Sequence, residues 1–517
     1  MRFPRASGVL LHPTSLPGPQ GSGDFGPAAY HFVDWLVAAG QTLWQILPLG
    51  GIGPGNSPYM SSSAFAGNVL LIDLAELAQR GWLERADLEP ADLEPAALVS
   101  ADLAVVPVFD PHRVDFAAVV PYRMQRLAQA AARFAASASA DERADLAAFC
   151  AAQQSWLPDH ALFMTLAEQF GGADWSDWDA PLATREPAAL RAASLRHAER
   201  VAFWTFCQWC FFRQWKALRQ HANQRGVQIV GDAPIFIANQ SAEVWARPEL
   251  FELDARGKPI AVAGVPPDLF SHTGQRWGNP LYRWSAHARE GYAWWVERIR
   301  RSFELVDIVR IDHFRGFAGY WEIPAAEATA VNGEWRAGPG EPLFKAIADA
   351  LGPLPIIAED LGVITPDVVS LRKAFGFPGM RILQFAFGGG NGNAFLPHNF
   401  DPDTVVYTGT HDNDTSRGWW ASATAAERQH LRDYLGVDGH EVHWDLIRAA
   451  CASVADTAVH PLQDVLGLGA AQRMNFPGKA EGYWEWRFTW DQVKPEHAQR
   501  LADLCRLYRR DGSALDL

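Results

Sequence analysis

The sequence predicts a (β/α)8 TIM barrel that carries a large, mostly helical insertion and long loops over the C-terminal face of the barrel. Short apolar runs rich in Ile or Val recur along the chain, as expected for parallel strands that are buried on both faces. Three of these runs end in a carboxylate, at Asp312, Glu359 and Asp412. If the strands form a parallel barrel, the three acids meet at the face where such barrels carry their active sites.

Residues 1–74 predict the first strand, helix and strand of this barrel. The runs SGVLL and TLWQILPL flank residues 28–39, whose apolar side chains recur at helical spacing and which end at Gly40, a typical C-cap residue. Two strands around one helix form a βαβ unit. The segment that follows, GGIGPGNSPYMSSSAFAGN, is dense in Gly, Ser and Pro and predicts a loop.

Residues 75–223 predict a helical insertion subdomain. Segments such as RMQRLAQAAARF are rich in Ala and Arg and have helical spacing. Cys207 and Cys210 form a C-x-x-C within the aromatic run FWTFCQWCFFRQW. Because no second cysteine pair accompanies them, buried core thiols are favoured over a zinc site.

Residues 224–517 predict the rest of the barrel domain. The strand candidates are VQIVGDAPIF, DIVRID, PIIAED, RILQFAF, TVVYTGTHD and LQDVLGL (residues 462–468), and a lid-like loop region is expected at about residues 239–300. Such a barrel uses about 250 residues, so roughly half of the 517 residues belong to insertions and loops. GGGNGN matches neither nucleotide-binding pattern and predicts a flexible loop at the top of the barrel.

Composition argues against several classes of partner. The 45 Lys and Arg against 59 Asp and Glu give a net charge of −14, the wrong sign for a nucleic-acid surface. No run approaches the ~20 apolar residues of a membrane span, and the N-terminal apolar run is too short for a signal peptide. A cytoplasmic protein without metal or cofactor is expected, and the sequence leaves the oligomeric state open.

Arg310 and Asp312 are two residues apart in DIVRID, so both side chains point to the same side of the predicted strand. A guanidinium beside a carboxylate favours the ionised form of the acid. An acid held in that form can act as a nucleophile toward an anomeric carbon. A buried structural ion pair is the equally weighted alternative.

Glu359 follows a proline and an apolar run in PIIAED. A carboxyl in apolar surroundings has a raised pKa, which suits a proton donor to a leaving oxygen. Asp360 is the competing candidate, because strand alternation lets only one of the two acids face inward. The alternative role for this acid is to cap the helix expected after Pro366.

Asp412 lies in THDND, whose hydroxyl, imidazole and carboxylates can hydrogen-bond densely to sugar hydroxyls. His411 could also ligate a metal, but no second His has a suitable spacing. Asp232 in VGDAPIF is a fourth acid at a strand end, with a capping or turn role as its alternative. Paired carboxylates are what the chemistry of glycosidic bonds requires.

Aromatic side chains are the other class of candidate, because their faces stack on sugar rings. The chain contains 22 tryptophans, which is many for its length. Trp277 in GQRWGNP and Tyr59 in SPYMSS are candidate platforms. Trp204, Trp209 and Trp215 lie on one helical run and are expected in the core.

With these segments assembled, the chain resembles the 4-alpha-glucanotransferases (amylomaltases, glycoside hydrolase family 77) of the alpha-amylase clan. The matching stretches occur in family order and cover nearly the whole chain. They are SGVLLHPTSLPG, WQILPLG, SPYMSSSAFAGN, GDAPIF, GVPPDLFSHTGQRWGNPLY, DIVRIDHFRG, IIAEDLG, LQFAF, YTGTHDNDT and RMNFPG.

The resemblance implies a role for individual residues. Asp312 is expected to be the nucleophile, Glu359 the general acid/base and Asp412 the transition-state stabiliser. Substrate contacts are expected from Arg310, His411, Asp232, Tyr59, Asp268, Trp277, Asn279 and Phe385. VPPDLFSHTG departs from the family's common VPPDYFSETG at Leu269 and His272, within the lid-like loop region.

The resemblance implies a retaining transfer of an α-1,4-glucan segment to the 4-OH of an acceptor glucan or glucose, by double displacement through a covalent glycosyl-enzyme. The expected partners are α-1,4-glucans and malto-oligosaccharides. An α-1,4-glucan hydrolase of the same clan uses the same three acids and is the nearest alternative. A non-catalytic glucan-binding protein is disfavoured because all three acids are present.

Overall fold

The computed structural model describes residues 3–88, 107–267, 271–479 and 481–512. Eight strands, all paired in parallel, form its central sheet in the order β10-β11-β12-β1-β2-β3-β6-β9. Their bounds are β1 Ala6–Leu10, β2 Leu43–Gln45, β3 Gln228–Pro234, β6 Ile308–Asp312, β9 Ile356–Ala358, β10 Gly379–Ile382, β11 Thr404–Tyr407 and β12 Thr457–Pro461. The Ala358 N–H of β9 donates a 3.0 Å hydrogen bond to the Pro378 carbonyl beside β10. This bond joins the two edge strands, and the predicted parallel barrel is confirmed.

The first βαβ unit forms as its sequence predicts. Helix α1 (Pro27–Ala38) begins at a proline, and Gly40 adopts a left-handed φ of 67° just beyond its end. A Cβ on Gly8 of β1 would lie 2.5 Å from the Cβ of Leu43 in β2. Glycine at this position therefore allows the close approach of the first two strands.

The eighth strand lies earlier than the sequence predicts. The predicted strand at residues 462–468 is wrong, because Leu462–Val465 form the short helix α17. The barrel strand is β12, in which every residue is buried. A polar His460 and a terminal Pro461 interrupt the apolar pattern of TAVHP, so the pattern does not reveal this strand.

Two other strands are shorter than the apolar runs that predict them. Only Leu43–Gln45 of TLWQILPL is strand, and RILQFAF leaves the sheet after Ile382 for the 3-10 turn η10 (Leu383–Phe385). Ile46 and Leu49 remain buried beyond the end of β2. An apolar run therefore predicts burial better than it predicts strand geometry.

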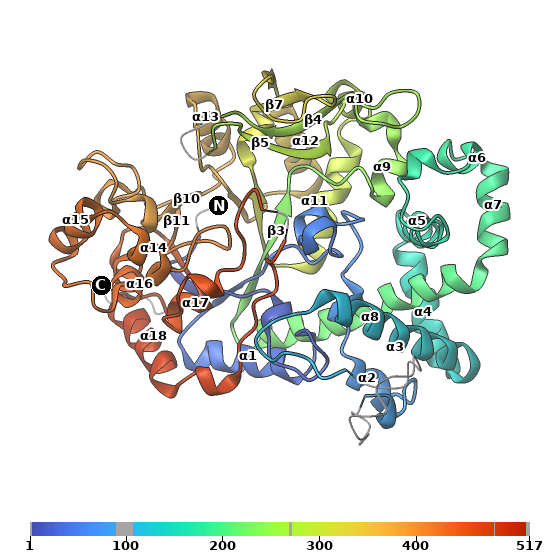
Figure 1. Cartoon of the computed structure of the whole chain (residues 1–517), viewed down its shortest axis with the longest axis horizontal. Helices are drawn as coiled ribbons and strands as arrows, with labels where there is room; N and C mark the ends of the chain where they lie inside the picture. The colour runs from blue at the N-terminus through green and yellow to red at the C-terminus, as the bar shows by residue number, and fades with distance from the viewer. Residues whose placement is uncertain (1–2, 89–106, 268–270, 480, 513–517) are drawn as a thin grey trace.

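Seven helices connect β2 to β3 in the described residues and lie to one side of the barrel (Figure 1). Their bounds are α2 Leu74–Gln79, α3 Phe116–Ser137, α4 Ala140–Ala152, α5 Leu157–Gln169, α6 Ala180–Ala183, α7 Pro187–Arg196 and α8 Ala198–Gln224. Helix α8 holds Cys207 and Cys210, both free and buried as predicted. The indole N–H of Trp215 on α8 donates 2.7 Å to the Leu305 carbonyl, which ties this block to the barrel. The division into a barrel domain and an insertion subdomain stays a prediction.

A second sheet lies above the barrel strands in the view of Figure 1 and is absent from the sequence prediction. It is antiparallel, with the order β5-β4-β7-β8. Its bounds are β4 Ala261–Val265, β5 Gln275–Pro280, β7 Gly319–Pro324 and β8 Glu334–Ala337. The region predicted as long lid-like loops at residues 239–300 thus contains two of these strands. Their Gly and Pro content, as in the QRWGNP of β5, hides them in a sequence pattern.

The remaining helices complete the cover of the barrel. They are α9 Ala242–Ala246, α10 Trp284–Arg289, α11 Ala293–Leu305, α12 Glu341–Leu351, α13 Pro366–Ala374, α14 Ser416–Ser422, α15 Ala425–Leu435, α16 Val442–Ala452 and α18 Pro495–Leu507. Within the described ranges, no helix combines the length and the apolar character that crossing a membrane requires.

Candidate active site

Arg310 holds two carboxylates at the ends of neighbouring strands. Its Nη1 lies 2.6 Å from Asp232 Oδ2, and its Nη2 lies 3.0 Å from Asp312 Oδ1. The register of β3 and β6 places Asp232 directly beside Arg310. The side chain of Asp312 is 28% exposed whereas that of Asp232 is fully covered. The ion pair is therefore real, and it leaves Asp312 accessible from the barrel mouth.

Asp232 is held in a tight polar cluster. Burial raises the pKa of this carboxyl, and the Arg310 guanidinium opposes that rise. The Tyr59 O–H donates 2.7 Å to Oδ2, the oxygen that also faces Arg310. Oδ1 is buried and has no hydrogen-bond partner among the described residues. Asp232 is part of this cluster and caps no helix.

Glu359 is the acid of its pair that faces the site. Oε2 accepts from the His313 N–H and Oε1 from the Leu361 N–H, both at 2.8 Å. Burial, and second the charge of Asp312, raise the pKa of Glu359 to about 8. The side chain is therefore mostly protonated at neutral pH, as its apolar run predicts.

Asp360 points away from the site into the barrel wall. Its Oδ1 accepts 2.7 Å from the Met380 N–H, and its Oδ2 lies 3.3 Å from the Arg372 Nε. Strand alternation thus separates the two adjacent acids. The N-cap residue of α13 is Thr365, so neither acid caps that helix.

Asp412 lies in the loop after β11 and is the most open of the three acids, with 44% of its side chain exposed. Its Oδ1 accepts 2.6 Å from the Asn475 amide, and its Oδ2 lies 3.4 Å from His411 Nε2. The His411 ring is stacked on Tyr59, with centroids 5.2 Å apart. Tyr59 thereby connects Asp232 to the His411–Asp412 pair.

The predicted substrate contacts Trp277, Asn279 and Phe385 differ in their burial and in their neighbours. Trp277 on β5 is half-buried and meets the His313 ring edge-on at 4.8 Å. Asn279 is buried and its amide lies 3.5 Å from the Met60 sulfur. Phe385 stands on the turn after β10 with 40% of its surface exposed.

Of the two residues at which the VPPDLFSHTG segment departs from the family pattern, only one lies in the described part of the chain. Asp268 and Leu269 lie outside the described residues, whereas His272 is described and exposed on the loop between β4 and β5. Within the described part of the chain, no cluster of three or more His, Cys, Asp or Glu side chains is arranged to hold a metal ion. His411 instead contacts an aspartate and a tyrosine.

Sequence reasoning missed several residues that surround the acids. Trp484 lies 5.7 Å from Tyr59, and Arg473 and Asn475 both bind Asp412. Arg473 and Asn475 lie in RMNFPG, which matches the family pattern, but these polar residues stand on no periodic element that would predict their direction.

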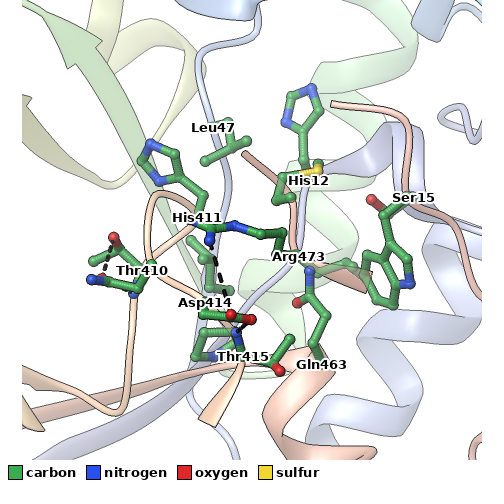
Figure 2. A pocket seen from close by; sticks show the side chains of 15 residues that line it. His12, Ser15, Leu47, Thr410, His411, Asp414, Thr415, Gln463 and Arg473 are labelled. Carbon is green, nitrogen blue, oxygen red and sulfur yellow. Dashed lines mark hydrogen bonds and ion pairs between the residues drawn. The ribbon is translucent and has the colours of Figure 1, made fainter. Parts of the chain in front are cut away.

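His411 lines a cavity (Figure 2) that residues at the ends of β1 and β12, Leu10 and Pro461, also line. Polar side chains line it, including His12, Ser15, Thr410, Asp414, Gln463 and Arg473. Burial, and then the nearby His411, lower the pKa of His12 to about 3. His12 is therefore neutral and adds no charge to the site at neutral pH.

The arrangement can activate and break a bond between two sugars. An accessible carboxylate that is paired with a guanidinium lies beside a protonated carboxyl in one barrel mouth. A third, exposed carboxylate and an imidazole stand next to them. A nucleophile and a proton donor are the two groups that a glycosidic bond needs.

Comparison with known proteins agrees with this geometry. The sequence model of the 4-alpha-glucanotransferases matches residues 11–492. The 4-alpha-glucanotransferase of Thermus thermophilus is 50% identical over 99% of this chain and 100% of its own length. That of Synechocystis is 48% identical over 98% of both chains. The amylomaltase of Streptococcus agalactiae in complex with acarbose superposes with a TM-score of 0.92 at 38% identity, covering 98% of this chain and 99% of that one. The chain belongs to the 4-alpha-glucanotransferase family.

Proposed function

We propose that this protein transfers α-1,4-glucan segments by double displacement, with Asp312 as nucleophile and Glu359 as general acid/base. The observation that carries the proposal is the difference in surroundings between Asp312 and Glu359. The Arg310 guanidinium pairs with Asp312 at 3.0 Å and leaves the Asp312 side chain 28% exposed, whereas burial raises the pKa of Glu359 to about 8. An accessible carboxylate that is paired with a guanidinium can serve as nucleophile, and a buried carboxyl that keeps its proton can serve as proton donor.

The first half of the reaction breaks the donor chain. The Asp312 carboxylate attacks the anomeric carbon while Glu359 gives its proton to the departing 4-oxygen. The products are a glycosyl ester on Asp312 and a shortened glucan. Glu359 is then ionised, which suits it to remove the proton from the 4-OH of an incoming acceptor. That oxygen displaces Asp312, so the anomeric configuration is retained and Glu359 regains its proton.

The polar residues around the two acids would hold the reacting sugar. Asp412 and His411 present a carboxylate and an imidazole at the open side of the site, where hydroxyl contacts strengthen as charge develops. Asp232 is fully covered and would act on the sugar through Arg310 and Tyr59, which it binds. Tyr59, Trp277 and the other predicted contacts would complete the site. The acarbose complex of the related amylomaltase supports malto-oligosaccharides as substrates.

Transfer instead of hydrolysis requires that a sugar reach the intermediate before water does. Trp277 of β5 contacts the ring of His313, the residue after Asp312, with centroids 4.8 Å apart, so a side chain of the second sheet stands where it would help to keep water from the intermediate. Incubation with maltotriose tests it. Glucose together with maltopentaose and longer products is expected, and glucose and maltose without any longer chain would contradict transfer.

A variant tests the assigned nucleophile. Asp312→Asn is expected to bind maltotriose and to lose turnover, because an amide cannot attack the anomeric carbon. Mass spectrometry of the wild type after brief exposure to a maltosyl fluoride should detect a maltosyl adduct on the peptide that contains Asp312. Full activity in Asp312→Asn would refute the role.

A further inference from the structure

Asp412 needs support that its own strand does not provide. It stands five residues beyond the end of β11 (Thr404–Tyr407), in a loop without regular structure. With 44% of the side chain exposed, packing does not hold the carboxylate in place. An acid that stabilises a short-lived charge must nevertheless be oriented before that charge appears, since reorientation during the reaction costs energy.

One segment, residues 473–475, supplies that support from the C-terminal part of the chain. The Asn475 amide donates 2.6 Å to Asp412 Oδ1, and the Asn475 N–H donates 3.1 Å to the His411 carbonyl. Arg473 Nη2 donates 2.8 Å to the backbone carbonyl of Asp412. Residues 473–475 thus hold the carboxylate of Asp412 and the backbone carbonyls of both His411 and Asp412.

Arg473 binds the backbone of both Asp412 and Asn475. Its Nε donates 2.7 Å to the carbonyl of Asn475, while its Nη2 binds that of Asp412. The guanidinium lies 4.3 Å over the Phe476 ring and is 15% exposed. Figure 2 shows Arg473 in the cavity that His411 also lines, next to Asp414, whose Oδ2 is 4.0 Å from Nη1.

We infer that Arg473 is a positioning residue for Asp412: its guanidinium clamps the carbonyls of Asp412 and Asn475 and so orients the carboxylate that stabilises the transition state. The inference rests on the proposed role of Asp412. Arg473 itself acts from behind the loop, through the backbone. The rigid fork of arginine can bridge two carbonyls, whereas the single ammonium of lysine cannot hold both in the same geometry.

The clamp is tested with Arg473→Met, Arg473→Lys and a matched control, Arg417→Met. Arg417 is exposed on α14 and also donates to a backbone carbonyl, that of Gly467, at 2.9 Å. For maltotriose transfer, Arg473→Met is expected to lower kcat on the order of 100-fold, as for a displacement of about 1 Å at the reacting centre. KM should change little, Arg473→Lys should lose less, and Arg417→Met should behave as wild type.

A double-variant cycle separates orientation from general damage. In the Asp412→Asn background, Arg473→Met should change the residual kcat by less than about twofold, because the group that it orients is already lost. An undiminished further loss would overturn the inference, as would wild-type kcat in folded Arg473→Met. If Arg473→Met does not fold, the same cycle with Arg473→Lys decides the question. Full activity in Asp412→Asn alone would instead refute the proposed role of Asp412.

Discussion

If Glu359 is the proton donor, as we propose, its protonation state sets the alkaline limit of turnover, and pH is therefore the most informative perturbation of this site. Glu359 must carry a proton in order to donate it to the leaving oxygen. Burial, followed by the charge of Asp312, raises its pKa to about 8. Below that pH the acid is protonated and competent. Above it the competent fraction falls tenfold per pH unit, so kcat/KM should decline along an alkaline limb that begins near pH 8.

The raised pKa can be expressed as a free energy that disfavours the ionised form of Glu359. A rise from the ordinary value of 4.5 to about 8 corresponds to roughly 5 kcal/mol against the ionised form. This penalty persists although Arg310 and two backbone N–H groups favour the carboxylate. Removing the like charge with Asp312→Asn should therefore lower the pKa of Glu359, which carbon NMR of the labelled carboxyl can follow without turnover.

The kinetic assay compares two donors between pH 5 and pH 10. Disproportionation of maltotriose, followed by the release of glucose, should show the alkaline limb. A maltosyl fluoride should not show it, because fluoride leaves without a proton and the second step uses Glu359 as a base. A limb that begins near pH 5, or one of equal shape with both donors, would refute the assignment of Glu359 as the proton donor.

Three further predictions concern the surroundings of the site and the barrel. Tyr59→Phe removes the O–H that donates 2.7 Å to Asp232 and should lower kcat/KM for maltotriose roughly tenfold; an unchanged value would show that this bond is dispensable. Arg510→Met removes a buried guanidinium that donates to six carbonyls, one in β1 and five between α16 and the start of β12, and should destabilise the fold by at least about 3 kcal/mol in urea unfolding. The exposed control Arg506→Met should lose under about 1 kcal/mol, and equal losses would contradict the reasoning. Gly8→Ala should lower the Tm, since its Cβ would lie 2.5 Å from Leu43 Cβ; an unchanged Tm would show that the strands can separate at little cost.

Local pattern was sufficient for the barrel and for its acids. Buried parallel strands appear as apolar runs, and Asp312 and Glu359 stand directly where their runs end, whereas Asp412 follows β11 after a short loop. The same reasoning failed at β12, where His460 and Pro461 break the apolar pattern, and at the second sheet, where β5 contains Gly and Pro and β8 is exposed throughout. It failed for a physical reason: burial there comes from neighbours that are distant in the sequence.

By itself, the sequence determined the fold class and indicated the different surroundings of Asp312 and Glu359. Arg310 lies two positions from Asp312, and an apolar run precedes Glu359, so both environments are encoded within a few residues. The tertiary structure decided what depends on closing the barrel. It directed the side chain of Asp360 away from the site, toward the backbone of Met380, and it brought Tyr59 to Asp232, which is 173 positions away in the sequence. It also brought residues 473–475 against Asp412. Such contacts arise between segments that meet only when the strands close in parallel, and no local period records them.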